Sequence, residues 1–118
     1  MSTIDDPSIL AVADELLGMT RVVRCVGEVD MASAPALRAR LSSLQIDGPP
    51  RLVLDLTGIT FIDSLGLGAL IGAHKRARVL RGSLVMVPSD AVRRVLAATA
   101  LDRVFDLRDT VDAALDEG

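Results

Sequence analysis

The sequence is poor in the residue types that carry catalysis, metal binding and base stacking. Its 118 residues include no Trp or Tyr, two Phe, one Cys and one His. A single Cys excludes an internal disulfide, and so few Cys and His side chains leave no cluster suited to zinc. Without aromatic side chains on which bases could stack, a surface for single-stranded nucleic acid is not expected. We therefore expect no cofactor and no metal site.

The charge and hydropathy patterns exclude two further classes of partner. The net charge is −3, and the basic residues are scattered along the chain, so no direct nucleic-acid contact is expected. No apolar run approaches the roughly 20 residues that a membrane helix needs, and no signal peptide opens the chain. These patterns predict a cytoplasmic protein without a membrane partner.

The pattern of apolar residues and turn signals predicts one α/β domain over residues 9–116, preceded by a flexible segment at 1–8. Two strands joined near Gly18 form an antiparallel hairpin, and strands then alternate with helices. Apolar runs such as 52–56 are typical of strands covered on both faces, usually in parallel pairs. The sequence therefore predicts a mixed β-sheet with flanking α-helices. The expected strands are 9–17, 20–26, 52–56, 83–87 and 103–107, and the expected helices start near 33, 64, 89 and 110.

Local signals mark the ends of these helices. Ser33 and Ser89 are candidate N-caps, since a serine oxygen can accept a bond from a free backbone N–H. Pro35 fits a first helical turn, and Gly82 is a candidate helix stop. Five apolar positions are expected in the core: Leu54, Leu56, Ile71, Val85 and Val95.

An enzyme active site finds little support. His74 lies ten residues after Ser64 in the same predicted helix, about 15 Å away, which is too far for a hydrogen bond. Three carboxylates (Asp30, Asp55, Asp63) could meet at strand ends but do not by themselves establish a site. The Gly66-Leu67-Gly68 stretch lacks the longer glycine pattern of a dinucleotide or P-loop motif. Cys25 lies in an apolar run, which favours a buried hydrophobe over a redox role.

Ser64 is the most informative position. Taken alone it would be an N-cap. However, glycines follow it inside the helix, where each costs about 1 kcal/mol relative to Ala. They also remove side chains around Ser64, which would leave the hydroxyl accessible to a kinase active site or a partner protein.

The run FIDSLGLG, placed after the strand LVLDL and with GEVD upstream, resembles the STAS domain of bacterial anti-sigma factor antagonists. The resemblance implies a binding module without catalytic activity. It implies that Ser64 is phosphorylated by an anti-sigma factor of the serine kinase type, and it allows a phosphatase as a further partner. The unphosphorylated form would bind the anti-sigma factor and release a sigma factor. The partner-binding residues implied are Asp30, Asp63, Ser64, Leu65, Gly66 and Gly68.

One residue departs from the family pattern. Relatives commonly carry Ser or Thr after the phosphoacceptor, where this chain has Leu65, so the motif holds a single hydroxyl. An alternative function stays open, because some STAS domains are not phosphorylated. The chain would then be a constitutive subunit of a larger assembly, such as a lipid-transport or stress-signalling complex.

Overall fold

The computed structural model describes residues 9–116, and the segment 1–8 that was predicted to be flexible lies outside them. The order of strands and helices matches the predicted order, with one short 3-10 helix added. The elements are β1 (Leu10–Leu17), β2 (Thr20–Val29), α1 (Ala34–Asp47), β3 (Arg51–Ile62), α2 (Ser64–Val79), β4 (Ser83–Pro88), α3 (Asp90–Ala98), η1 (Leu101–Arg103), β5 (Asp106–Leu107) and α4 (Val111–Leu115).

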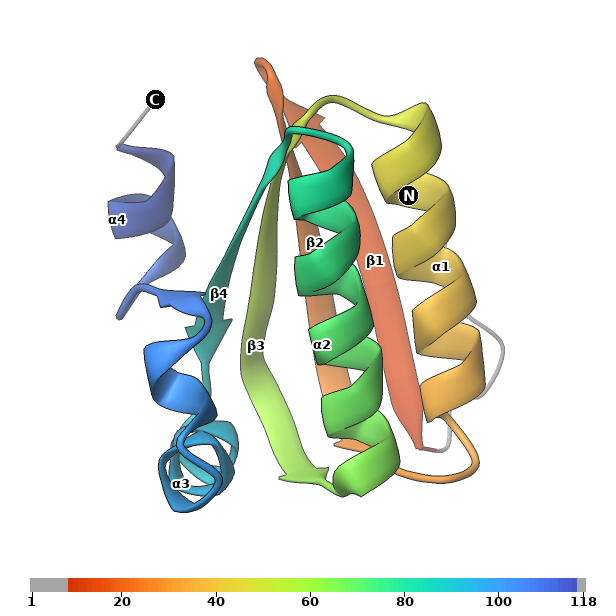
Figure 1. The fold of residues 1–118 in the computed structure, drawn as a ribbon, viewed down its shortest axis with the longest axis vertical. Coiled ribbons are helices and arrows are strands. Elements are labelled where there is room, and N and C mark those ends of the chain that lie inside the picture. Colours follow the sequence, from red (N-terminus) through yellow and green to blue (C-terminus); the bar gives the residue numbers. More distant parts are fainter. Residues whose placement is uncertain (1–8, 117–118) are drawn as a thin grey trace.

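The five strands form one mixed sheet in the order β1-β2-β3-β4-β5 (Figure 1). β1 and β2 pair antiparallel through a turn at Gly18, whose φ of +62° suits glycine. The remaining neighbours pair in parallel through helical crossovers. The predicted α/β fold with an N-terminal antiparallel hairpin is therefore confirmed.

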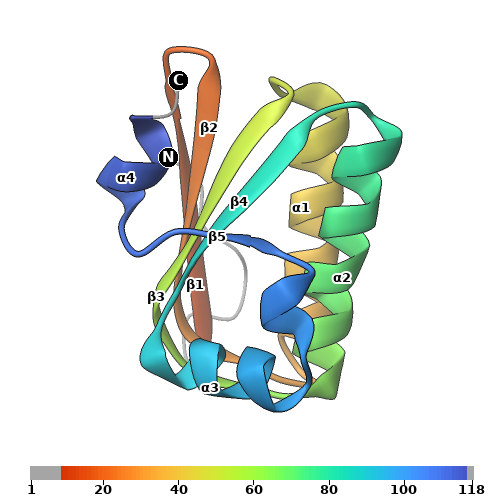
Figure 2. The same ribbon diagram turned by 60° about the vertical axis from the view of Figure 1, so that its left-hand side comes forward.

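The helices cover the two faces of the sheet unequally (Figure 2). α1 and α2 pack side by side on one face, α4 lies against the other, and α3 lies at the end of the sheet where β3 and β4 terminate. Of the five predicted core positions, Leu54, Leu56 and Val85 are fully buried. The other two, Ile71 and Val95, are partly buried against the main apolar cluster.

β3 is longer than predicted because two irregularities let the strand continue past Gly58. In the pairing with β2, β3 carries one extra residue at each of two places, next to Asp55 and next to Thr60. The Asp55 carboxylate accepts hydrogen bonds from the Thr57 N–H (3.0 Å) and hydroxyl (2.7 Å), which holds the first bulge. Gly58 is required there, since a Cβ would lie 2.9 Å from the Val26 side chain.

The end of α2 differs from the predicted glycine stop. Arg81, not Gly82, takes the left-handed conformation, with φ of +57°. The Gly82 N–H donates to the Ala77 carbonyl and the Arg81 N–H to the Arg78 carbonyl, which is a Schellman ending. Gly82 has another role, because a Cβ at this position would lie 2.3 Å from the Pro50 carbonyl oxygen.

A partly buried ion cluster joins the hairpin to α1. Asp14 on β1 accepts hydrogen bonds from Arg21 on β2 (2.9 Å) and from Arg40 on α1. Burial acts to raise the pKa of the Asp14 carboxyl, but hydrogen bonds and charge from Arg40 and Arg21 outweigh burial and hold the pKa below its ordinary value. The edge strand is thereby fixed to the helical layer.

Candidate functional site

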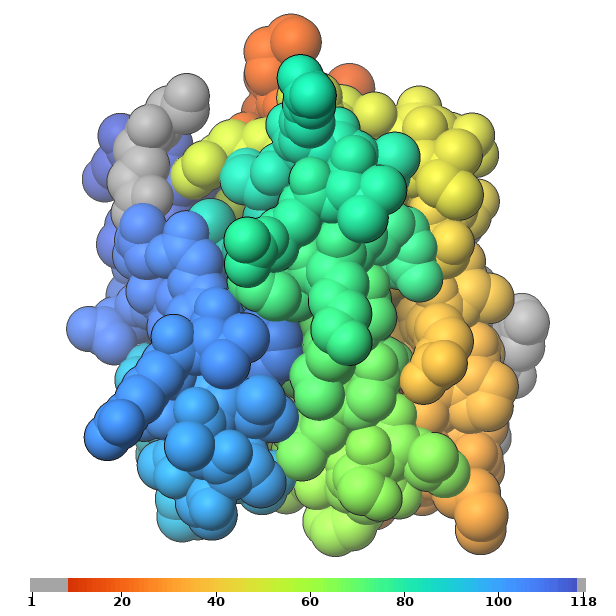
Figure 3. All heavy atoms as spheres, viewed as in Figure 1, coloured from red at the N-terminus to blue at the C-terminus, as the bar shows by residue number. Residues whose placement is uncertain are grey.

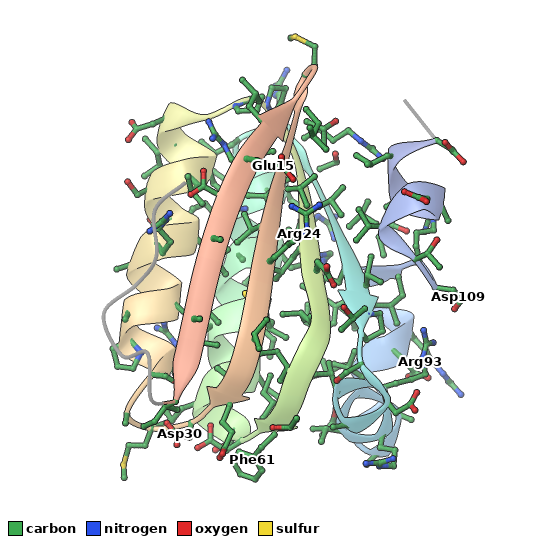
Figure 4. The ribbon with its side chains drawn as sticks, turned by 180° about the vertical axis from the view of Figure 1, so that it is seen from behind. Glu15, Arg24, Asp30, Phe61, Arg93 and Asp109 are labelled. Carbon is green, nitrogen blue, oxygen red and sulfur yellow. The ribbon has the colours of Figure 1, made fainter. Side chains whose placement is uncertain are left out.

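Ser64 lies at the end of the sheet where three helices begin. β2, β3 and β4 run parallel, so the starts of α1, α2 and α3 all lie beside the carboxyl ends of these strands. Ser64 is the first residue of α2 and is separated from the end of β3 by Asp63 alone. In the view from behind, Asp30 and Phe61 mark the same end of the sheet (Figure 4). Polar residues that follow different strands, such as Asp30 after β2 and Ser64 after β3, therefore lie at the same end of the sheet.

Asp63, and not Ser64, is the N-cap of α2. Its backbone is extended, and its Oδ1 accepts hydrogen bonds from the Leu65 N–H (3.0 Å) and the Gly66 N–H (2.9 Å). The Asp63 N–H in turn donates to the Val29 carbonyl (3.1 Å), which fixes the end of β3 against the end of β2. The capping interpretation of Ser64 is therefore wrong, because β3 ends one residue too early for Ser64 to occupy that position.

The Ser64 side chain lies at the surface. The residue is exposed, and within residues 9–116 its hydroxyl has no hydrogen-bond partner. Because Asp63 accepts the hydrogen bonds of two backbone N–H groups in the first turn, the serine oxygen is not needed to cap the helix. The geometry is that of an exposed hydroxyl at a fixed helix start.

Asp30 shapes the turn between β2 and α1. Its Oδ1 accepts hydrogen bonds from the Ala32 N–H (2.9 Å) and the Ser33 N–H (3.1 Å). Ser33 occupies the N-cap position of α1 without capping the helix, because its hydroxyl accepts from the Asp30 N–H and donates to the Glu28 carbonyl. Ser33 is thus at the predicted N-cap position, but its side chain does not form the predicted capping bond, whereas Ser89 caps α3 as predicted.

Two of the three predicted carboxylates follow adjacent strand ends. Asp30 and Asp63 follow the adjacent ends of β2 and β3, which the Asp63 N–H to Val29 carbonyl bond holds together. Asp55 lies farther back on β3, on the face where Arg24 and Glu15 pair, and its Oδ2 lies 4.0 Å from Arg24 (Figure 4). Asp55 therefore does not belong to the site.

Gly66 faces inward and is not part of the exposed surface. A Cβ at this position would lie 2.7 Å from Ile62 Cγ1, 2.8 Å from Val29 Cγ1 and 3.0 Å from the Val29 carbonyl oxygen. Glycine lets the first turn of α2 rest directly on the ends of β2 and β3. The expectation that Gly66 clears the surface around Ser64 is wrong, because its missing side chain makes room for the core.

Leu65 borders a groove between α1 and α2. The groove has a volume of about 540 Å³, and its lining includes Pro35, Arg38, Leu65 and Arg76. Leu65 is 46% exposed, and Gly68 is partly buried beneath Arg38. Gly68 therefore leaves room for the Arg38 side chain, whereas Gly66 leaves room for the core.

Exposed apolar side chains flank the site, and the sequence did not predict them. Met31 is 73% exposed and Phe61 is 48% exposed. Phe61 also lines a second groove, of about 350 Å³, between β3 and α3, together with Arg94. The second bulge of β3 breaks the alternation of inward and outward residues, so Phe61 faces solvent while Ile59 and Ile62 are buried. Apolar character alone would predict that Phe61 is buried, so its exposure could not be predicted from the sequence.

Other candidate chemistry is not assembled in the described residues. His74 packs edge-to-face on Phe105, with ring centroids 5.4 Å apart. Burial raises the pKa of the Cys25 thiol to about 12, with a further contribution from the Asp55 charge, so the thiol stays protonated near neutral pH. Between residues 9 and 116 there is no group of three or more His, Cys, Asp or Glu side chains placed to hold a metal. No helix in the same range is long and apolar enough to cross a bilayer.

The assignment of the cap predicts unequal effects at neighbouring positions. Asp63→Ala should lower the free energy of unfolding by about 1–2 kcal/mol, because two backbone N–H groups lose their acceptor. Asp63→Asn, which retains a capping oxygen, should lose much less. Ser64→Ala should change stability by less than about 0.5 kcal/mol. Urea denaturation of the three variants measures this ranking, and a larger loss for Ser64→Ala than for Asp63→Ala would contradict the assignment.

Comparison with known proteins identifies the family of this chain. The model of the STAS domain matches residues 11–114. An anti-sigma-B factor antagonist of Listeria monocytogenes is 32% identical over 83 residues, which cover 70% of this chain and 73% of that protein.

Solved structures agree with the sequence match. An anti-sigma factor antagonist from Mycobacterium paratuberculosis has a TM-score of 0.82 at 33% identity, covering 97% of each chain. The anti-sigma factor antagonist SpoIIAA in its unphosphorylated form has a TM-score of 0.74 at 25% identity, covering 91% of this chain and 95% of that one. Its phosphorylated form, from Bacillus, has a TM-score of 0.70 at 24% identity, covering 91% and 98%, a likeness that shows the fold alone. The chain therefore belongs to the STAS domain family, among relatives that are anti-sigma factor antagonists.

Proposed function

We propose that this protein is an anti-sigma factor antagonist whose unphosphorylated form binds an anti-sigma factor of the serine kinase type and so releases a sigma factor. Phosphorylation of Ser64 by that kinase, using ATP, ends the interaction. The observation that carries the proposal is the exposed Ser64 hydroxyl, which has no hydrogen-bond partner among residues 9–116, at a helix start held by Asp63. The names of the relatives support the anti-sigma factor as partner.

The surroundings of Ser64 suit a protein interface. Three exposed apolar side chains, Met31, Phe61 and Leu65, lie on the segments next to it. Large apolar and aromatic groups provide much of the binding energy at the centre of protein interfaces. The two grooves beside Leu65 and Phe61 give a partner concave surfaces on either side of the serine.

A phosphate would change this surface mainly by its charge. It adds about −1.5 to −2 units near neutral pH, and the start of a helix tolerates negative charge. The fold should therefore remain intact. In a docked complex, however, the phosphate would be desolvated beside the Asp30 and Asp63 carboxylates, where like charges repel. The switch thus acts on the interface and not on the folding of the domain.

Phosphorylation by the partner tests the proposal directly. Incubation with ATP and the cognate anti-sigma factor kinase should add one phosphate, which tandem mass spectrometry should place on Ser64. Ser64→Ala should accept none. Thr60→Ala is the matched control, because Thr60 is an exposed hydroxyl of the same segment, bonded to the Gly27 carbonyl, and its loss should leave the phosphate in place.

A phosphate on another residue would overturn the proposed switch. If Ser64 accepts none while the protein still binds a multiprotein complex, the chain would act as a constitutive STAS subunit, which is the alternative that Leu65 beside the acceptor keeps open.

A further inference from the structure

Arg38 is an exposed cation beside the start of α2. It lies in the second turn of α1, and its Nη2 is 3.3 Å from the position that a Cβ on Gly68 would take. Within residues 9–116, Arg38 has no hydrogen-bond or ion-pair partner. Arg76, the other guanidinium of the α1–α2 groove, differs in this respect, since it donates to Gln45 Oε1 (2.8 Å).

The face of α2 beneath Arg38 leads directly to Ser64. Gly68 follows Ser64 by four residues, so the two positions lie on one face of the helix, with Cβ positions about 5–6 Å apart. Since Gly68 has no side chain, this position places no side-chain atoms between the guanidinium and the serine. The starts of α1 and α2 lie side by side at the lower surface of the molecule (Figure 3).

We propose that Arg38 is the internal counter-ion of the Ser64 phosphate, an inference that rests on the proposed function. The guanidinium lies within about 9 Å of the Ser64 Cβ position, taking the distance to Gly68 and one helical turn together. The phosphate extends from that Cβ, and changes of rotamer along the arginine side chain close the remaining gap. Arginine pairs with phosphate through two parallel charge-assisted hydrogen bonds.

A cation would stabilise a phosphate at the first turn of α2, because few other groups there can neutralise its charge. A phosphate at a helix start normally draws on free backbone N–H groups, but Asp63 Oδ1 already accepts from those of Leu65 and Gly66. The carboxylates of Asp63 and Asp30 add repulsion. Arg38 offsets this charge from the side of α1, whereas Arg94 lies in the groove between β3 and α3. In moving to the phosphate, Arg38 leaves its position over Gly68. Phosphorylation therefore also changes the groove between α1 and α2.

The second ionisation of the phosphate measures this pairing. Phosphoserine incorporated at position 64 during translation gives the modified protein without any kinase, and ³¹P NMR follows its titration. The pKa, ordinarily about 6, should rise by at least about half a pH unit in Arg38→Gln, because a cation that favours the dianion is lost. Arg38→Lys should give an intermediate value. Arg76→Gln is the matched control and should titrate like the parent, since Arg76 lies twelve residues along α2, about 18 Å from Ser64.

Equal pKa values for the parent and Arg38→Gln would overturn the inference. An equal rise in Arg76→Gln would also overturn it, since the effect would then come from the general charge of the groove. Because no kinase takes part, failure of the kinase to modify Ser64 would count against the proposed function and leave the pairing intact. Conversely, labelling of Ser64 with an unchanged pKa in Arg38→Gln would count against the pairing alone.

Discussion

Replacing Gly66 by valine is expected to lower the free energy of unfolding by on the order of 3 kcal/mol or more. The new Cβ alone would lie within 3.0 Å of Ile62 Cγ1, Val29 Cγ1 and the Val29 carbonyl oxygen, and the two methyl groups of valine would add to the overlap. To relieve it, the start of α2 must move away from the sheet and weaken its cap. Domains are typically stable by about 5–15 kcal/mol, so this loss is large.

Urea denaturation with a matched control isolates the cause. Gly72→Ala adds a Cβ on the same helix where the nearest atom, Arg76 Nη2, lies 4.0 Å away. That variant should gain up to about 1 kcal/mol from helix propensity. If the free energy of unfolding of Gly66→Val lies within about 0.5 kcal/mol of the parent value, Gly66 is not packed as described. If Gly66→Val is destabilised as expected, weak partner binding by Gly66 variants would result from unfolding and would not locate the interface.

Ser64→Glu is expected to bind the anti-sigma factor at least tenfold more weakly than the parent, whereas Ser64→Ala should bind without regulation by ATP. The glutamate brings part of the phosphate's charge beside Asp30 and Asp63, and like charges pressed together at an interface cost several kcal/mol. A single carboxylate carries less charge than the phosphate, so the phosphorylated protein should bind more weakly still. Both variants should remain folded, because Asp63 caps the helix.

Isothermal titration calorimetry against the anti-sigma factor measures the affinities. Ser43→Glu, at an exposed serine in the third turn of α1, adds the same charge away from the site and should bind like the parent. Equal affinity of Ser64→Glu, the phosphorylated protein and the parent would remove the basis for a charge switch at this position.

The order of the elements could be predicted from the sequence because it depends on local patterns. The turn at Gly18, the cap at Ser89 and the apolar run 52–56 each act within a few residues of the chain. Pro35 falls in the first turn of α1 as expected. Such signals do not depend on what packs against them, and the structure confirms them.

The details of the site could not be predicted because they depend on contacts between distant residues. Asp63 and Ser64 are both good capping residues, and the choice between them follows from the bond of the Asp63 N–H to the Val29 carbonyl. Glycine at 66 looks the same in a sequence whether it opens a surface or fits against a core. The outward turn of Phe61 follows from the pairing register of β3 with β2.

Each strand of the sheet lies beside the strand that precedes it in the chain. A chain emerging from the ribosome therefore meets every pairing partner already synthesised, and no strand has to be inserted between two others. The end of β2, the end of β3 and the start of α2, which together hold Ser64, all lie within residues 28–68. The segments that hold Ser64 are thus translated before β4, α3 and α4, whereas the groove beside Phe61 forms only when α3 has been added.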